Sequence, residues 1–186
     1  YIVTPNARDV AAGLIDGYRS GIHSFTVIGS YGTGKSSFLL ALEKNLLGDD
    51  SVNLLNPHTL STNGKFEVLK MVGDYKDLAS LMRDKLQIDG PETNVLDNLR
   101  EIYGRVKKQG KFLVILIDEF GKVLEHAAKK NPEQELYFMQ KLAEFVNVTT
   151  RQILLITTLH QNFSSYARKL TDVQKEEWTK VKGRFK

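Results

Sequence analysis

The chain has 186 residues, of which 41% are hydrophobic and 26% charged, and it carries a formal net charge of +4 with a pI of about 9.1. This length and composition suit one α/β domain with a substantial core. No apolar run approaches a membrane span, the N-terminus lacks a secretory pattern, and the absence of cysteine excludes disulfides and thiolate metal sites, so we expect a cytoplasmic protein without membrane contact.

The N-terminal part predicts a helix, a strand and a second helix. The first helix spans 6–20 after Pro5, and Gly21 is suited to its C-terminal cap. Its apolar residues recur at four-residue steps, at Val10, Leu14 and Tyr18. Residues 25–28 then indicate a buried strand, and 37–44 a helix.

The octapeptide GSYGTGKS, at 29–36, lies between this strand and helix and matches the pattern G-x-x-x-x-G-K-[ST]. Its glycines let the loop turn back and aim backbone N–H groups at a phosphate, beside the positive end of the following helix. Lys35 would reach the β- and γ-phosphates, and the Ser36 hydroxyl would bind Mg²⁺. The alternative is a glycine-rich turn that binds nothing. The predicted nucleotide-binding residues are Gly29, Ser30, Tyr31, Gly32, Thr33, Gly34, Lys35, Ser36 and Ser37.

The middle of the chain predicts further alternation of strands and helices. The expected segments are an irregular stretch, a strand and a helix, at 48–64, 66–72 and 74–85. Gly90-Pro91 interrupts the chain, and we expect Thr93 to cap a helix that reaches about Lys108, before Gly110. The apolar residues of that helix lie on one stripe, at Val95, Leu96, Leu99, Ile102, Tyr103 and Val106.

Six consecutive apolar residues, 112–117, run directly into Asp118 and Glu119. Such a run is typical of a strand that is buried on both faces of a parallel sheet. Ligands bind at the carboxyl ends of the strands in such sheets, so these two acids should face the same crevice as the glycine loop. Asp118 would then bind Mg²⁺, and Glu119 would polarise the water that attacks the γ-phosphate. The alternative is that one acid caps the helix expected at 120–130.

The last predicted elements are a helix at 133–146, which Pro132 precedes, and a strand at 153–156. Strands that alternate with helices imply right-handed crossovers and a parallel sheet. We therefore expect one α/β domain, 1–186, with a parallel sheet sandwiched between two helical layers.

On GSYGTGKS at 29–36 and LVILIDEF at 113–120, the chain resembles the AAA+ ATPases and their P-loop relatives with an additional strand and a catalytic glutamate. The resemblance implies that Asp118 binds the metal and that Glu119 is the catalytic base. The segment after 153–156 looks like the strand that carries a polar residue beside the γ-phosphate. Thr158 is the first choice for this role and His160 the second.

Residues 180–185, KVKGRF, are similar to the Arg-Val-x-Ser-Arg-Phe stretch of the initiator-like AAA+ clade. The resemblance implies that Arg184 is an arginine finger that enters a neighbouring subunit's site, and hence a homo-oligomer. Gly183 and Lys180 depart from the pattern, and the alternative is a solvated basic tail. The clade's adenine pocket would fall on residues near the N-terminus, namely Tyr1 to Thr4, Asn6 and Arg8.

The resemblance implies ATP and Mg²⁺ as ligands, and the chain lacks the Asn-Lys-x-Asp motif that reads guanine. Relatives continue beyond this point into a fifth core strand and a helical lid, so we expect a piece of a larger protein. Four stretches are similar to large ATPases of bacterial antiviral defence loci, namely DEFGKVLEHA, QELYFMQKLAEFVN, TLHQNF and QKEEWTKVKGRF. The alternative to a working ATPase is a STAND-type signalling or scaffold module with little turnover. A small-molecule kinase is disfavoured because no acceptor site is recognisable.

Basic residues form local clusters that could contact the phosphate backbone of nucleic acid. The clusters are Lys107-Lys108-Lys111, Lys129-Lys130 and Arg168-Lys169. Lysines near helix C-termini also complement the helix dipole, so solvated helix ends are the simpler explanation. A nucleic-acid or protein partner of the full chain therefore stays open.

Overall fold

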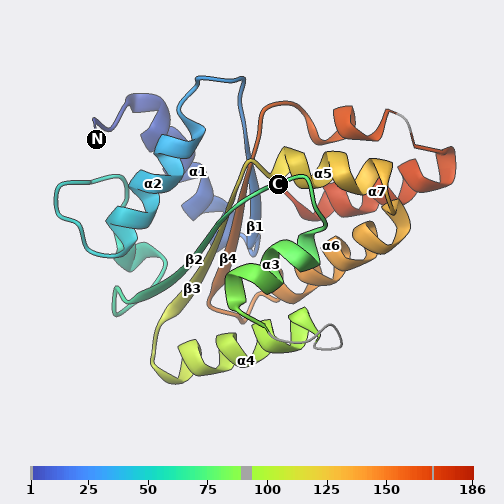
Figure 1. Ribbon diagram of the computed structural model, residues 1–186. Coiled ribbons are helices and arrows are strands. Elements are labelled where there is room, and N and C mark those ends of the chain that lie inside the picture. Colours follow the sequence, from blue (N-terminus) through green and yellow to red (C-terminus); the bar gives the residue numbers. More distant parts are fainter. Residues whose placement is uncertain (1, 89–93, 169) are drawn as a thin grey trace.

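A computed structural model describes residues 2–88, 94–168 and 170–186 and has a parallel β-sheet at its centre (Figure 1). The sheet has the order β1-β4-β3-β2. Its strands are β1 (Ser24–Ile28), β2 (Phe66–Val72), β3 (Phe112–Asp118) and β4 (Ile153–Leu159). All three neighbouring pairs are parallel, which confirms the predicted sheet type.

Helices cover both faces of the sheet, so the predicted sandwich of helices, sheet and helices is confirmed (Figure 1). One face carries α1 (Pro5–Arg19) and α2 (Lys35–Leu46). The other carries α3 (Leu78–Leu86), α4 (Val95–Lys108), α5 (Phe120–Lys129), α6 (Pro132–Val146) and α7 (Asp172–Arg184). Two short 3₁₀ helices are η1 (Pro57–Thr59) and η2 (Phe163–Ala167). No helix within the described ranges is long and apolar enough to cross a membrane.

Strand β3 explains why the core has two halves. Successive side chains of a strand point to opposite faces, and every residue of β3 is buried. Phe112, Val114 and Leu116 pack with α1 and α2, whereas the alternate residues pack with the other five helices. The continuous apolar run seen in the sequence is therefore a strand covered on both sides, as predicted.

Two helix starts differ from the prediction. Helix α3 begins at Leu78 instead of 74, because the Asp77 carboxylate accepts a hydrogen bond from Ser80 N (2.7 Å) and fixes the cap there. Helix α4 is capped by Asn94, whose side chain accepts from Leu96 N (2.9 Å). Thr93, the predicted cap, and Gly90-Pro91, the predicted break, lie outside the described residues.

Strand β4 is longer than predicted, since it continues past 156 to Leu159. Thr157 pairs with Ile117 of β3 on one side and with Thr26 of β1 on the other. Both flanking strands extend this far, so the polar threonines stay within the sheet and are buried. Thr158 is therefore part of the strand itself.

Helix α7 was not predicted, and it places residues 180–184 on a packed helix instead of a solvated tail. Thr171 and Gln174 form a capping box at its start. Trp178 is buried and donates from Nε1 to the Phe163 carbonyl (3.0 Å), and Val181 and Phe185 also enter the core. These three side chains lie three and four positions apart, as one helical face requires.

Glu135, on α6, is a buried acid that the fold holds at an energetic cost. One carboxylate oxygen accepts from Leu78 N (3.3 Å), at the start of α3. Burial raises the pKa of Glu135 to about 7, the bond from Leu78 opposes the rise, and the nearby charge of Asp77 adds to it. Because this pKa is higher in the folded than in the unfolded chain, the protonated acid favours folding. The benefit is complete below about pH 4.5 and is lost as the pH rises through 7.

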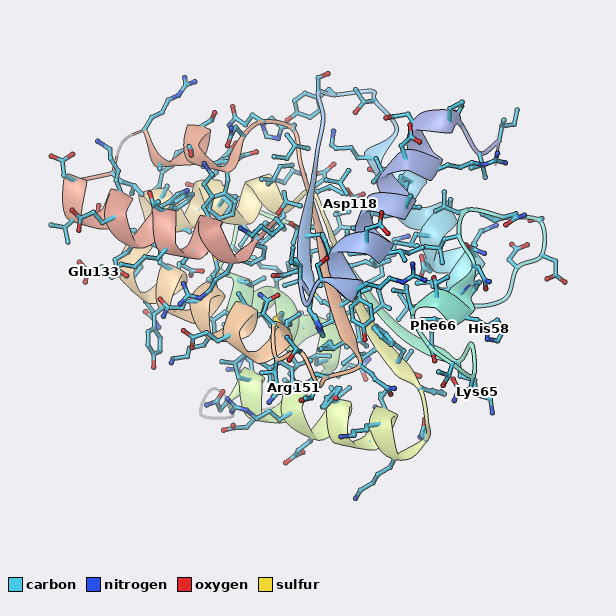
Figure 2. The ribbon with its side chains drawn as sticks, turned by 180° about the vertical axis from the view of Figure 1, so that it is seen from behind. His58, Lys65, Phe66, Asp118, Glu133 and Arg151 are labelled. Atoms are coloured by element: carbon cyan, nitrogen blue, oxygen red, sulfur yellow. The ribbon has the colours of Figure 1, made fainter. Side chains whose placement is uncertain are left out.

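We therefore expect Glu135→Gln to be more stable than the unmodified chain by about 2 kcal/mol at pH 8, since the amide keeps an acceptor for Leu78 N without a charge. The difference should vanish near pH 4.5. Urea unfolding at a series of pH values measures it, and Glu133→Gln, on the exposed side of the same helix, is the matched control (Figure 2). Equal or lower stability of the Glu135 variant at pH 8 would contradict this explanation.

Candidate functional site

The loop at 29–36 connects β1 to α2 and is shaped by its glycines. Gly32 and Gly34 have φ angles of 79° and 84°, which side chains rarely adopt, and Gly34 is the N-cap of α2. At Gly29, a Cβ atom would lie 2.7 Å from Thr33 Oγ1, so a larger residue would displace the Thr33 hydroxyl. The loop is thereby curled over the N-terminus of α2, where free N–H groups favour an anion.

Lys35 reaches back across this loop. Its Nζ donates to the carbonyl oxygens of Gly29 (2.5 Å) and Ser30 (2.8 Å). The Thr33 hydroxyl also donates to Ser30 O (2.8 Å). An ammonium group is therefore held among the backbone atoms that would surround a phosphate.

A cavity of about 630 Å³ opens beside the loop and brings together predicted residues from three separate segments. Those in its wall are Tyr31, Gly32, Gly34, Lys35, Ser36, Ser37, Asp118, Glu119 and Thr158. Sequence reasoning missed Lys122, Glu125 and Leu159, and named His160 only as a second choice. Gly29, Ser30 and Thr33 belong to the same loop but are not in the wall. Figure 2 shows Asp118 at the end of the sheet away from Lys65 and Arg151, so the cavity lies at the carboxyl edge.

A hydrogen-bonded turn fixes the two acids after β3. The hydroxyl of Thr158 donates to Asp118 Oδ1 (2.6 Å), and Glu119 N donates to both that oxygen and Thr158 Oγ1 (2.9 Å each). Asp118 is 8% exposed, and its Oδ2 has no hydrogen bond among those of the described residues. Asp118 is thus oriented through one oxygen while the other stays available.

Glu119 occupies the N-cap position of α5, but its side chain makes no capping hydrogen bond. Its backbone is left-handed, with φ 51°, which few residues other than glycine adopt. The carboxylate forms an ion pair with Lys122 and is about half exposed, and this pair raises the pKa of Lys122. The capping alternative therefore does not account for the Glu119 side chain.

Gly73, which follows β2 directly, is a site residue that the sequence analysis missed. Its N–H donates to the Asp118 carbonyl (2.7 Å), and a Cβ atom at this position would lie 2.4 Å from the Glu119 carbonyl oxygen. The turn that carries the two acids thus packs against the backbone of Gly73, where there is no room for a side chain. The only sequence signal is a glycine immediately after a predicted strand.

We expect Gly73→Ala to displace the Asp118-Glu119 turn, because the clash is with backbone atoms that cannot rotate away. Overpacking of this kind costs about 1–3 kcal/mol of unfolding free energy. Thermal and urea unfolding measure the loss. Gly104→Ala is the control, since a Cβ atom there meets nothing within 4 Å and alanine favours a helix. The two variants should change stability in opposite directions, and a neutral Gly73→Ala would show that the turn can move.

Arg184 lies away from the cavity, near the start of β1. Its guanidinium contacts Glu144 (3.3 Å) and donates to the Lys180 carbonyl (3.0 Å). Its carbonyl oxygen accepts from Asn147 Nδ2 (3.2 Å) and from the Ser24 hydroxyl. Arg184 is therefore not part of the wall of this cavity.

The predicted adenine-contacting residues do not line the cavity either. Thr4 caps α1 by accepting from Ala7 N (3.2 Å), and the described residues 2–4, Asn6 and Arg8 are absent from the cavity wall. Tyr1 lies outside the described residues. The structure thus groups residues of the 29–37 segment with the two acids, and the described residues predicted to contact adenine lie outside this group.

Comparison with solved structures confirms the fold that the resemblance implies. The Orc2 protein of Aeropyrum pernix matches in its ADPNP–ADP complexes (TM-score 0.60, 14% identity) and in its ADP form (0.57, 16%), each over 100% of this chain and 48% of that one. Cdc6p of Pyrobaculum aerophilum matches with a TM-score of 0.52 and 15% identity, over 95% of this chain and 43% of that one. No family model and no curated protein matches the chain. The chain thus spans less than half the length of these structures.

Proposed function

We propose that the chain binds Mg-ATP in this cavity and hydrolyses it to ADP and phosphate. The observation that carries the proposal is that Lys35, Ser36, Asp118 and Glu119 line one cavity although they come from two distant segments. A phosphate-binding loop, a metal-binding hydroxyl and a pair of acids are together what phosphoryl transfer to water needs. The structures of similar fold in complex with ADPNP and ADP support a nucleotide as the ligand.

The residues fit Mg²⁺, because a hydroxyl and a carboxylate are oxygen ligands of the kind this ion prefers. Ser36 lies at the start of α2, and Asp118 keeps one oxygen without a hydrogen bond among the described contacts. Ser36 and Asp118 would hold the ion, which when bound would neutralise charge on the phosphates. Thr158 would keep Asp118 oriented for this task.

The remaining residues would act on the phosphates and the water. Lys35 and the backbone N–H groups of the loop would hold the β- and γ-phosphates. The Glu119 carboxylate would take the proton of the attacking water once it has left Lys122. In an oligomer, Arg184 would leave Glu144 and enter the neighbouring subunit's site, where an arginine stabilises charge in the transition state.

The hydrolysis would drive conformational change or assembly in a larger homo-oligomeric protein that acts on a nucleic-acid or protein partner. A role in bacterial antiviral defence rests only on the similarity of the four stretches given above. Adenine is favoured over guanine because the guanine-reading motif is absent from the sequence.

A STAND-type module with little turnover is the second candidate, and the ion pair between Glu119 and Lys122 favours it. A carboxylate oxygen that is held by the Lys122 ammonium is not free to accept a hydrogen bond from an attacking water. In this case nucleotide binding alone would stabilise one conformation of the larger protein.

Calorimetry with ATP, with and without Mg²⁺, tests the proposal. We expect the unmodified chain to bind Mg-ATP at least about tenfold more tightly than ATP with EDTA, and Ser36→Ala to lose this dependence on Mg²⁺. Ser164→Ala, on η2 outside the cavity wall, is the matched control. A folded chain that binds no nucleotide under either condition would overturn the proposed function.

A further inference from the structure

A second cavity, of about 420 Å³, lies where the start of α3, the end of α5 and the start of α6 meet. These three helices cover the same face of the sheet (Figure 1). The wall contains two acids, Asp77 and Glu135, together with His126, Tyr137 and Phe138. No described residue belongs both to this wall and to that of the cavity beside the phosphate loop. The proposed function therefore gives this second cavity no task.

The N–H groups at the start of α3 use only one oxygen of each acid. Ser80 N donates to Asp77 Oδ1 (2.7 Å), and Leu78 N donates to Glu135 Oε2 (3.3 Å). Asp77 Oδ2 and Glu135 Oε1 have no hydrogen bond among those of the described residues. Glu135 is only 6% exposed, so bulk water has little access to its second oxygen. His126 Nδ1 is likewise buried without a partner in the described part of the chain. Three polar atoms at one cavity are thus left unbonded.

The charges of the two acids are not compensated. Neither acid forms an ion pair with a described residue, and Lys76, beside Asp77 in the sequence, pairs with Asp84 instead (2.5 Å). Burial raises the pKa of Glu135, and the nearby charge of Asp77 raises it further. A cation in the cavity would act in the opposite direction on both carboxylates, because it attracts their ionised forms.

The rest of the wall favours a flat cation with several N–H groups. His126 lies in the last turn of α5, where the aligned carbonyl groups give the helix end a partial negative charge. Tyr137 and Phe138 provide aromatic side chains, and a guanidinium group stacks on such rings. The guanidinium also donates in several directions within one plane, so it can contact two carboxylates at once. An ammonium group lacks this flat shape.

We propose that this cavity binds a guanidinium group, which Glu135 and Asp77 hold through their free oxygens. The group belongs either to a small molecule such as agmatine or to an arginine side chain of a partner protein, and the chemistry that recognises it is the same. The proposal does not rest on nucleotide binding. It gives a reason for an acid whose burial lowers the stability of the free chain, since a buried carboxylate is stabilised once a cation is paired with it.

Calorimetry at pH 8, where Glu135 is ionised, tests the proposal with three probes. The probes are agmatine, a blocked Ala-Arg-Ala peptide, and the same peptide with citrulline in place of arginine. Citrulline has nearly the shape of arginine but carries no charge. We expect at least one guanidinium probe to bind, and the citrulline peptide to bind at least about tenfold more weakly than that probe, because hydrogen bonds between charged groups are the stronger ones.

Glu135→Gln tests the principal ligand, and we expect it to weaken the binding of the guanidinium probe at least about tenfold. The variant keeps an acceptor for Leu78 N and should be more stable than the unmodified chain at pH 8, so the loss cannot come from unfolding. Asp77→Asn should weaken binding less, because Asp77 is only half-buried, and asparagine still caps α3. Glu133→Gln, exposed and outside the cavity wall, is the matched control and should bind normally.

The two guanidinium probes distinguish the sources of the ligand. Binding of agmatine alone identifies a small molecule, and tighter binding of the arginine peptide identifies a side chain of a partner protein. Equal binding shows that the cavity recognises the guanidinium group by itself. The proposal is overturned if neither probe binds to the folded chain, if the citrulline peptide binds as well as the arginine peptide, or if Glu135→Gln binds as tightly as Glu133→Gln.

Discussion

Replacing Lys35 with alanine should weaken Mg-ATP binding by about 100-fold or more, because two charge-assisted contacts to the β- and γ-phosphates are lost together. No other residue described here places an ammonium among the loop carbonyls, where it contacts Gly29 O and Ser30 O. Calorimetry at equal protein concentration measures the loss, and circular dichroism shows whether the variant is folded.

Lys44→Ala is the matched control for this variant. Lys44 lies on the same helix, but its ammonium pairs with Asp49 (3.6 Å) near the far end. Removing it changes the net charge by the same amount without touching the loop. If both variants bind ATP as the unmodified chain does, Lys35 does not contact the nucleotide and the phosphate-loop assignment is wrong.

Glu119→Gln should preserve Mg-ATP binding within about twofold and lower turnover by at least about tenfold, since the amide cannot accept the proton of water. Single-turnover release of phosphate measures this rate. The substitution also breaks the ion pair with Lys122, but that pair is half exposed and contributes little to stability. Glu101→Gln, on α4, controls for the loss of one surface carboxylate.

The result also separates the two candidate functions. Unchanged turnover in Glu119→Gln would remove Glu119 from the catalytic role. If the unmodified chain binds ATP but shows no turnover in single-turnover experiments, the STAND-type alternative is favoured.

The elements that the sequence predicts well are those whose buried residues form a recognisable apolar pattern within one short segment. Strand β3 is apolar at every position before Asp118, and α4 carries one apolar stripe, so each pattern has one interpretation. The loop at 29–36 is also local, because its glycines and Lys35 form a contiguous motif. Each of these features is determined by residues that are close together in the sequence, so the sequence alone is enough to predict it.

The features that escape prediction depend on contacts between distant segments. Thr157 and Thr158 are polar, and only the flanking strands show that they remain within the sheet. Gly73 matters because its backbone packs closely against Glu119. The residues next to Gly73 in the sequence give no indication of this contact. Helix α7 buries few side chains among many charged ones, so its apolar face is too narrow to stand out.

The central place of β4 in the sheet has a mechanical consequence. This strand contacts both β1 and β3, and the chain continues from it through His160 into η2 and then α7. Trp178 ties α7 back to η2 through the Phe163 carbonyl. A displacement at the cavity end of β4 would therefore shift η2 and, through the hydrogen bond from Trp178, also α7, which carries Arg184.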